Sequence, residues 1–119
     1  MFRLYGKEIL MLEFFVSFGT GALIIFFGIM HMRGNISSLH SYHRNKVVPE
    51  NIPAFGRLVG LGTILCGVSL IIFSGFGLLT EITGNDLFVL VGSVIMTIGF
   101  AVGLAISLYA IKKYNGSIF

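Results

Sequence analysis

One long polar stretch, Arg33–Arg57 (RGNISSLHSYHRNKVVPENIPAFGR), separates the hydrophobic segments of the chain and decides its organisation. It holds four of the eight Lys and Arg residues and two of the three histidines. On either side of it, uncharged apolar residues run for about the length of a membrane-crossing helix. The sequence therefore predicts apolar helices joined by one basic loop.

The composition points to an integral membrane protein. Of the 119 residues, 55% are hydrophobic and only 11% are charged, and an average soluble domain has roughly 25% charged residues. So few charges would not cover a water-facing surface. The net charge of +3 lies beside apolar segments, where Lys and Arg signal topology and contact with anionic lipid, so we expect no nucleic-acid partner.

The predicted fold is all-α, with three transmembrane helices in a single domain over residues 1–119. The uncharged segments are about 14–32, 58–80 and 87–111, and the shortest of them spans roughly 28 Å as a helix. We interpret residues 1–13 as a short interfacial segment that leads into the first span. A signal peptide is the competing interpretation, which we disfavour because the apolar run continues far beyond any cleavage-like residues.

The distribution of Lys and Arg predicts the orientation of the chain. The basic loop 33–57 and the C-terminal tail together hold six basic residues, whereas the N-terminus holds two. These six are Arg33, Arg44, Lys46, Arg57, Lys112 and Lys113. We therefore expect a multi-pass cell-membrane protein with its N-terminus outside and its C-terminus in the cytoplasm.

Within the loop, the spacing of apolar residues and histidines predicts a short cytoplasmic amphipathic helix from Asn35 to about Lys46. Its apolar face would consist of Ile36, Leu39, His40, His43 and Val47, at i, i+3, i+4, i+7 and i+11. Such a helix would lie on the headgroups, with Arg44 and Lys46 toward anionic lipid. Pro49 and Pro53 would end it.

Small residues form a stripe along each predicted span, and the chain has 16 glycines in all. Because lipid tails are as apolar as leucine, helices in a bilayer associate by close packing, which small residues permit. Dimerisation is the alternative, but we favour packing within one chain, because the short connection already forces the last two spans together. The stripes are Ser17, Gly21 and Gly28; then Gly56, Gly60, Thr63, Gly67 and Ser74; then Gly92, Gly99, Gly103, Ser107 and Ala110.

The predicted spans contain no Asp, Glu, Lys or Arg, which argues against an ion-coupled transporter formed by a single chain. Glu13, at the entrance of the first span, is the nearest exception. Small multidrug-resistance transporters have a functional glutamate early in their first helix, but this chain has three predicted spans instead of four and no Trp. We interpret Glu13 as an interface residue.

Three histidines, His31, His40 and His43, are the candidate metal or haem ligands. His40 and His43 would share a helical face, and three imidazoles can bind zinc or copper. No cysteine lies near them, and the single Cys66 sits mid-span, where we expect it to pack as a small hydrophobe. We expect no cofactor. No catalytic constellation or phosphate-binding glycine motif occurs, so we expect no enzymatic activity.

Two motifs give the chain a resemblance to known proteins. They are Gly34-Asn35-Ile36 with the loop to Tyr42, and Phe55-Gly56-Arg57 leading to Gly60. Over residues 18–75 the chain resembles a family of small, uncharacterised bacterial integral membrane proteins. It is more remotely similar to the membrane part of SdpI-type immunity and signalling proteins. The resemblance implies a small protein of the bacterial inner membrane and supplies no catalytic residue.

The leading functional hypothesis is a non-enzymatic membrane protein that acts by helix–helix contact, as an accessory, regulatory or immunity-type partner of a larger membrane protein. The absence of ionisable residues within the spans and the small-residue stripes motivate it. One alternative is an oligomeric small-solute transporter or channel in which Glu13 acts as a gate. A further alternative is a metal- or haem-binding membrane subunit.

Overall fold

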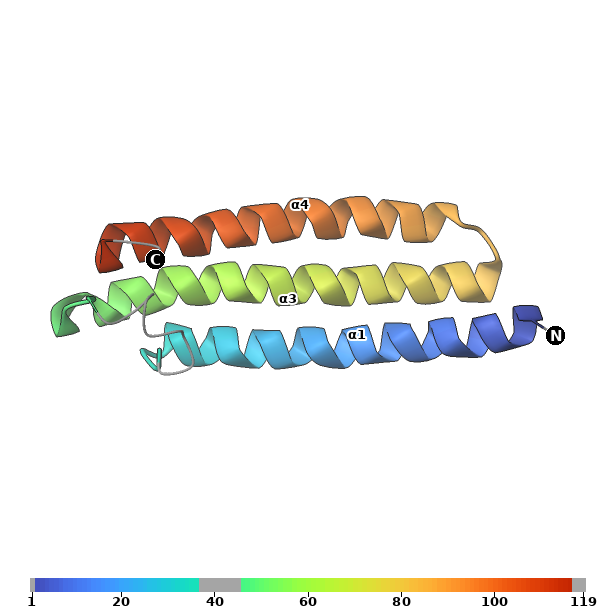
Figure 1. The fold of residues 1–119 in the computed structure, drawn as a ribbon, viewed down its shortest axis with the longest axis horizontal. Coiled ribbons are helices and arrows are strands. Elements are labelled where there is room, and N and C mark those ends of the chain that lie inside the picture. Colours follow the sequence, from blue (N-terminus) through green and yellow to red (C-terminus); the bar gives the residue numbers. More distant parts are fainter. Residues whose placement is uncertain (1, 37–45, 117–119) are drawn as a thin grey trace.

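Three long helices make up most of the computed structural model, which describes residues 2–36 and 46–116, with side chains from Met11 onward (Figure 1). The helices are α1 (Phe2–Met32), α3 (Ile52–Thr83) and α4 (Leu87–Ala110). A short 3-10 helix, η1 (Pro49–Asn51), precedes α3, and a π-helical turn, η2 (Ile111–Asn115), follows α4. All elements in the described ranges are helical, as the sequence predicts.

All three helices are long and apolar enough to cross a membrane. At 1.5 Å per residue they are about 46, 48 and 36 Å long, against a hydrocarbon core of about 30 Å. The sequence-based expectation of three such helices is confirmed. Each extends beyond what a bilayer core would need, so their ends have room to reach the headgroup level.

The helix boundaries differ from the uncharged segments in two places. α1 begins at Phe2, so the predicted interfacial segment 1–13 continues into the first span as one helix. α3 begins at Ile52, ahead of the predicted span 58–80, and Pro53 lies in its first turn. Proline fits there because the first-turn N–H groups have no partner within the helix. The last residues of the predicted loop 33–57, including Arg57, are therefore helical.

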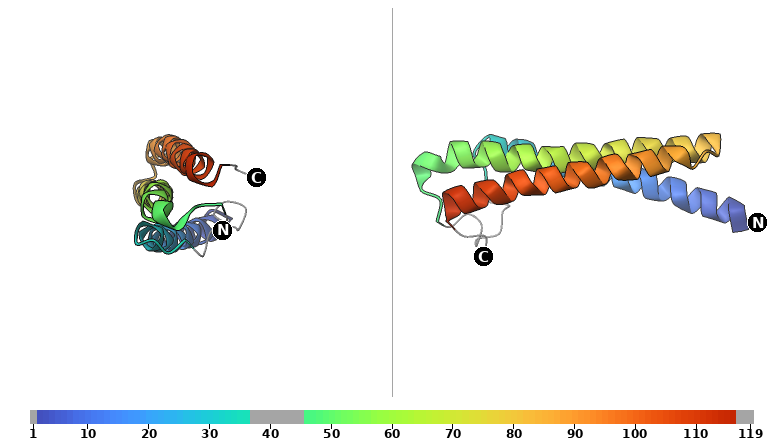
Figure 2. Two further views of the ribbon diagram at one scale, coloured as in Figure 1. Left: turned by 90° about the vertical axis from the view of Figure 1, so that its left-hand side faces the viewer. Right: turned by 90° about the horizontal axis from the view of Figure 1, so that it is seen from above.

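α3 lies in the middle, with α1 packed on one side of it and α4 on the other (Figures 1 and 2). Neighbouring helices run antiparallel, so the two chain termini lie at opposite ends (Figure 1). The whole chain measures 58 × 22 × 21 Å, and because α1 and α4 pack on opposite sides of α3, the helices form a layer rather than a closed bundle. The outward faces of α1 and α4 are consequently left uncovered.

A tight turn fixes the antiparallel pairing of α3 and α4. Gly84 ends α3 in the left-handed conformation (φ 74°), and its N–H donates to the carbonyl of Thr80 at 2.7 Å. The buried Thr80 hydroxyl donates to the carbonyl of Asn85 at 3.0 Å and accepts from the N–H of Val89 at 2.8 Å. One threonine therefore links the end of α3 to the start of α4.

The predicted amphipathic loop helix falls mainly on residues 37–45, which lie outside the described residues, as do His40, His43 and Arg44. The structure describes the residues on both sides of this range. Before the gap, Asn35 and Ile36 are not helical, and after it Lys46 lies in a turn and Val48 has extended backbone. Ile36 and Val47, both on the predicted apolar face, pack against the same hydrophobic cluster.

Candidate functional site in the helix faces and the basic end

Paired glycines bring α1 and α3 into backbone contact. A Cβ added to Gly21 would lie 2.8 Å from the carbonyl oxygen of Gly67, and one added to Gly67 would lie 2.7 Å from that of Gly21. Gly28 and Gly60 repeat the arrangement, at 3.0 and 2.5 Å. Such distances leave almost no room for a methyl group, so four glycines named from the sequence lie where two backbones touch.

The loop end of this interface is formed by His31 and Gly56. His31 is buried near the end of α1, and a Cβ on Gly56 would overlap the His31 carbonyl oxygen. Gly56 therefore lets the last turn of α1 rest on the first turns of α3. At the other end, the ring of Phe14 lies over Gly77 and packs edge-on against Phe73 at a centroid distance of 5.8 Å.

α3 and α4 meet through a second set of small residues. A Cβ on Gly103 would lie 2.6 Å from the Gly62 carbonyl oxygen and 2.7 Å from the Cys66 sulfur. One on Gly99 would overlap the Ser69 hydroxyl oxygen, and one on Gly92 would lie 2.7 Å from Cβ of Phe76. The glycines of the predicted α4 stripe thus face α3.

α3 has two packing faces, and the sequence pattern predicted only one of them. The predicted stripe, with Gly56, Gly60 and Gly67, faces α1. The opposite face, with Gly62 and Ser69, meets α4. The missed signal is the spacing of seven residues between Gly62 and Ser69, which is the same as the spacing between Gly60 and Gly67. A helix held between two neighbours needs both stripes, because each neighbour requires its own close approach.

Three hydroxyl-bearing residues named from the sequence, Ser17, Thr63 and Ser107, are only partly buried. Ser17 is partly buried on α1. Thr63 donates its hydroxyl to the Val59 carbonyl within α3 at 2.8 Å. Ser107 reaches across from α4 to the same carbonyl at 3.5 Å, the limit of a hydrogen bond. Only Ser107 of these three links two helices by a hydrogen bond.

A further small-residue stripe lies on α4, away from α3, and sequence reasoning missed it. It consists of Ser93, Thr97, Ala101 and Ala105, at steps of four residues. We call it the outer α4 stripe. Ser93 is partly buried and the other three are exposed. Ser93 and Thr97 line a shallow hollow, and each donates its hydroxyl to a carbonyl of its own helix at 2.8 Å.

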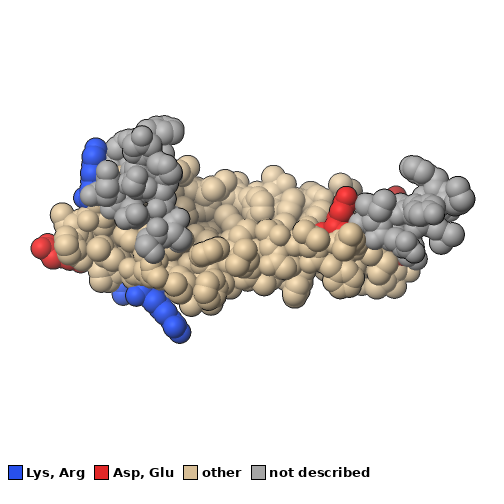
Figure 3. All heavy atoms as spheres, turned by 60° about the horizontal axis from the view of Figure 1, so that its bottom comes forward, with Lys and Arg blue, Asp and Glu red and all other residues tan. Residues whose placement is uncertain are grey.

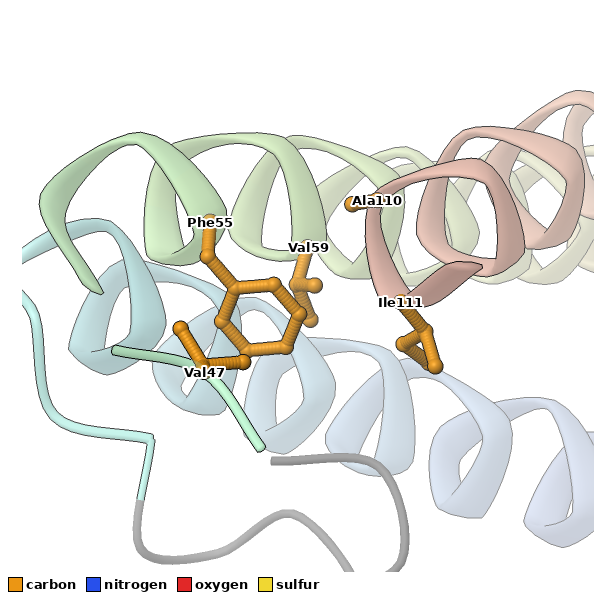
Figure 4. Packing of buried hydrophobic residues seen from close by; sticks show 5 residues of the cluster. All are labelled: Val47, Phe55, Val59, Ala110 and Ile111. Atoms are coloured by element: carbon orange, nitrogen blue, oxygen red, sulfur yellow. The ribbon is translucent and has the colours of Figure 1, made fainter. Parts of the chain in front are cut away.

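At the loop end, a hydrophobic cluster ties the loop to the C-terminal turn (Figure 4). Phe55 and Val59 from α3 pack with Val47 of the loop and with Ala110 and Ile111 of α4 and η2. The cluster joins segments that lie far apart in the sequence, so it holds the loop end against both α3 and η2.

Asn115 adds a polar contact to this cluster. Its side chain is only 1% exposed, and its amide oxygen accepts the backbone N–H of Lys46 at 2.8 Å. The Tyr114 ring packs edge-on against Phe55 at 6.2 Å. The residues after α4 therefore bind the end of the loop, an arrangement we call the clasp. It fixes where the chain enters α3.

Basic side chains gather at this same end (Figure 3). Arg33, Lys46, Arg57, Lys112 and Lys113 are all exposed, and all lie in or beside the helix ends that meet there. Glu81 and Asp86 lie at the opposite end, beside the turn between α3 and α4. The fold thus brings together five of the six basic residues predicted to lie on one side of the membrane, and the sixth, Arg44, lies outside the described residues.

The candidate metal ligands are not brought together in the described part of the chain. His31 is buried at the end of α1, whereas His40 and His43 lie outside the described residues. Among residues 2–36 and 46–116, no group of three His, Cys, Asp or Glu side chains is placed to hold a metal ion. The metal hypothesis stays a prediction that rests on the sequence.

The chain matches no family model, no curated protein and no solved structure.

Proposed function

We propose that this chain is a non-enzymatic membrane protein that acts by helix–helix contact, as an accessory, regulatory or immunity-type partner of a larger membrane protein. In this proposal it crosses the cell membrane three times, with its N-terminus outside and its C-terminus and basic loop in the cytoplasm. A larger partner would pack against the helix faces that the chain itself leaves uncovered.

The observation that supports this proposal is the outer α4 stripe. The glycines of α1, α3 and α4 that face one another are already in contact within the chain, so they offer no surface to a partner. The outer α4 stripe has the same step of four residues, yet Thr97, Ala101 and Ala105 remain exposed. In the part of the chain that the structure describes, it is a small-residue stripe that remains open to another helix.

The chemistry of this stripe suits a helix in lipid. Small side chains allow a second backbone to come close, which gains van der Waals contact that lipid tails would not match. The hydroxyls of Ser93 and Thr97 already bond within α4, so exposure to lipid leaves no donor unmet. They can add a bond to a neighbouring helix, a contribution of roughly 0.6 kcal/mol on average.

The proposal is tested by adding bulk on the stripe. Ala101→Leu fills the close-approach surface with a residue that favours helix and suits lipid. Ala22→Leu makes the identical change at an exposed position of α1 and serves as the matched control. The protein is purified from its native membrane in mild detergent, and the molar ratio of any co-purifying membrane protein is measured.

We expect the Ala101→Leu protein to lose a stoichiometric partner that the unchanged chain and the Ala22→Leu control both retain. Equal retention by all three would refute the outer α4 stripe as the contact surface. If no second polypeptide accompanies the unchanged chain at a fixed ratio, the accessory role itself is wrong.

A second candidate function, an oligomeric small-solute transporter or channel, is supported by the position of Glu13. Its side chain is exposed, and the adjacent Phe14 packs over Gly77. From Gly77, α3 continues to Thr83, roughly 9 Å further along the helix axis. Glu13 would therefore lie within the length of α3, short of the helix end at Thr83. This candidate requires solute uptake by protein in liposomes that Glu13→Gln abolishes.

A further inference from the structure

Two exposed stripes, one on α3 and one on α4, each end in a basic residue at the loop end. Their members are apolar except at that end, where each stripe has one cation and the α4 stripe also has a tyrosine. On α3 the stripe is Arg57, Leu61, Val68, Ile72 and Leu79, and on α4 it is Val91, Ile95, Ile98, Val102, Tyr109 and Lys113. The steps of three, four and seven place each set on one side of its helix.

The two stripes lie on the same edge of the helix layer. Val59 of α3 and Ile111 of η2 meet in the hydrophobic cluster on one edge. Residues two positions before or after them point about 200° away around the helix. Arg57 on α3, and Tyr109 and Lys113 on α4 and η2, consequently share the opposite edge.

The basic ends of the two stripes also lie at the same level along the helices. Ser107 reaches the Val59 carbonyl, and Gly103 packs on Gly62, which sets the antiparallel register of α3 and α4. In that register, Arg57 lies level with the last turn of α4, where Tyr109 stands. The two cations therefore lie at the same end of one edge, on neighbouring helices.

Aromatic rings hold one of these cations in place. The Lys113 ammonium lies 5.8 Å from the centroid of the Tyr109 ring and 5.3 Å from that of Tyr114. Both distances fall within the range of cation–π attraction. The Lys113 and Tyr109 side chains remain exposed, so the ammonium is oriented while still open to a ligand.

We propose that this edge binds an anionic phospholipid. The phosphate would lie between Arg57 and Lys113 with the Tyr109 hydroxyl beside it, and the acyl chains would lie along the apolar parts of the two stripes. Charge complementarity supports the choice: Arg and Lys bind phosphate by charge-assisted hydrogen bonds. Among the described residues at this end, the carboxylate is Glu50, which lies in η1 ahead of α3 and is not a member of either stripe.

The binding is measured by native mass spectrometry of the full chain in detergent, titrated with phosphatidylglycerol or with phosphatidylcholine. The test variant is Arg57→Gln with Lys113→Gln. The matched control is Arg33→Gln with Lys46→Gln, which removes the same charge from the same end but from residues outside the two stripes. Circular dichroism confirms that each variant keeps its helix content.

We expect one phosphatidylglycerol to be retained in preference to phosphatidylcholine, and inorganic phosphate not to displace it. Each basic residue near an anionic headgroup contributes roughly fivefold in affinity, so the test variant should bind roughly 25-fold more weakly. The control variant should bind as tightly as the unchanged chain. Equal binding of both lipids, or an equal loss in the test and control variants, would overturn the proposal.

Discussion

The inner glycine faces and the outer α4 stripe use the same kind of residue at the same spacing, yet only the inner faces are in contact within the chain. Gly60 and Gly67 lie against the backbone of α1, whereas Ala101 and Ala105 lie exposed. The difference shows that a small-residue stripe permits close approach but does not determine which helix packs against it. The covered stripes pack the helices of this chain together, and the uncovered stripes remain available for contact with other molecules.

Gly67→Leu should have the largest effect, because it breaks an inner face. A Cβ there would lie 2.7 Å from a carbonyl oxygen of α1, so α1 and α3 would be forced apart. We expect a loss of stability at or beyond the usual overpacking range of about 1–3 kcal/mol. Thermal unfolding in detergent, followed by circular dichroism, measures it.

Gly75→Leu is the matched control for that variant. It lies on the same helix, and an added Cβ would meet nothing within 4 Å. We expect its stability to match or exceed that of the unchanged chain, because leucine favours helix over glycine by roughly 0.8 kcal/mol. Equal destabilisation by the two variants would mean that contact between α1 and α3 does not depend on the glycine face.

Asn115→Leu should have an intermediate effect, and it asks whether the loop end is held by a specific polar contact as well as by packing. The change removes the acceptor of the Lys46 N–H in a buried setting. Leaving that donor unmet costs about 1–3 kcal/mol. We expect faster proteolytic cleavage in the loop while the cleavage rate in the turn between α3 and α4 stays unchanged. Uniform acceleration at both sites would argue against a local clasp.

Ala101→Leu should have the smallest effect on the isolated chain. Its side chain points away from α3, so the stability of the purified protein should change by no more than about 0.5 kcal/mol. The same thermal unfolding measurement checks it. A loss as large as that of Gly67→Leu would place Ala101 inside the fold and would remove the distinction between inner and outer stripes.

The helices were predictable from the sequence because charge is absent over long stretches, and lipid-length apolar runs have few other interpretations. A packing stripe on α3 was predictable as well, since Gly56, Gly60 and Gly67 repeat at helical steps, but the sequence did not indicate that α1 is the helix it faces. The face toward α4 was missed, because Gly62 and Ser69 can be recognised as packing residues only once α3 is known to lie between two helices. Periodicity alone does not reveal how many neighbours a helix has.

The clasp at the loop end was beyond sequence reasoning for a different reason. Asn115 and Lys46 are 69 positions apart, and an asparagine near a chain end is ordinarily a solvated residue. Its burial depends on η2, where the chain widens into a π-helical turn. The common edge of Arg57 and Lys113 likewise depends on the register between α3 and α4, which local patterns do not encode.

Site-directed photo-crosslinking in the native membrane tests the central claim most directly. A photoreactive amino acid replaces Thr97 on the outer α4 stripe in one variant and Ile72 on the exposed edge of α3 in another. Our account predicts a discrete adduct with a larger membrane polypeptide from position 97 and lipid adducts alone from position 72. The same products from both positions, or lipid adducts alone from position 97, would contradict it.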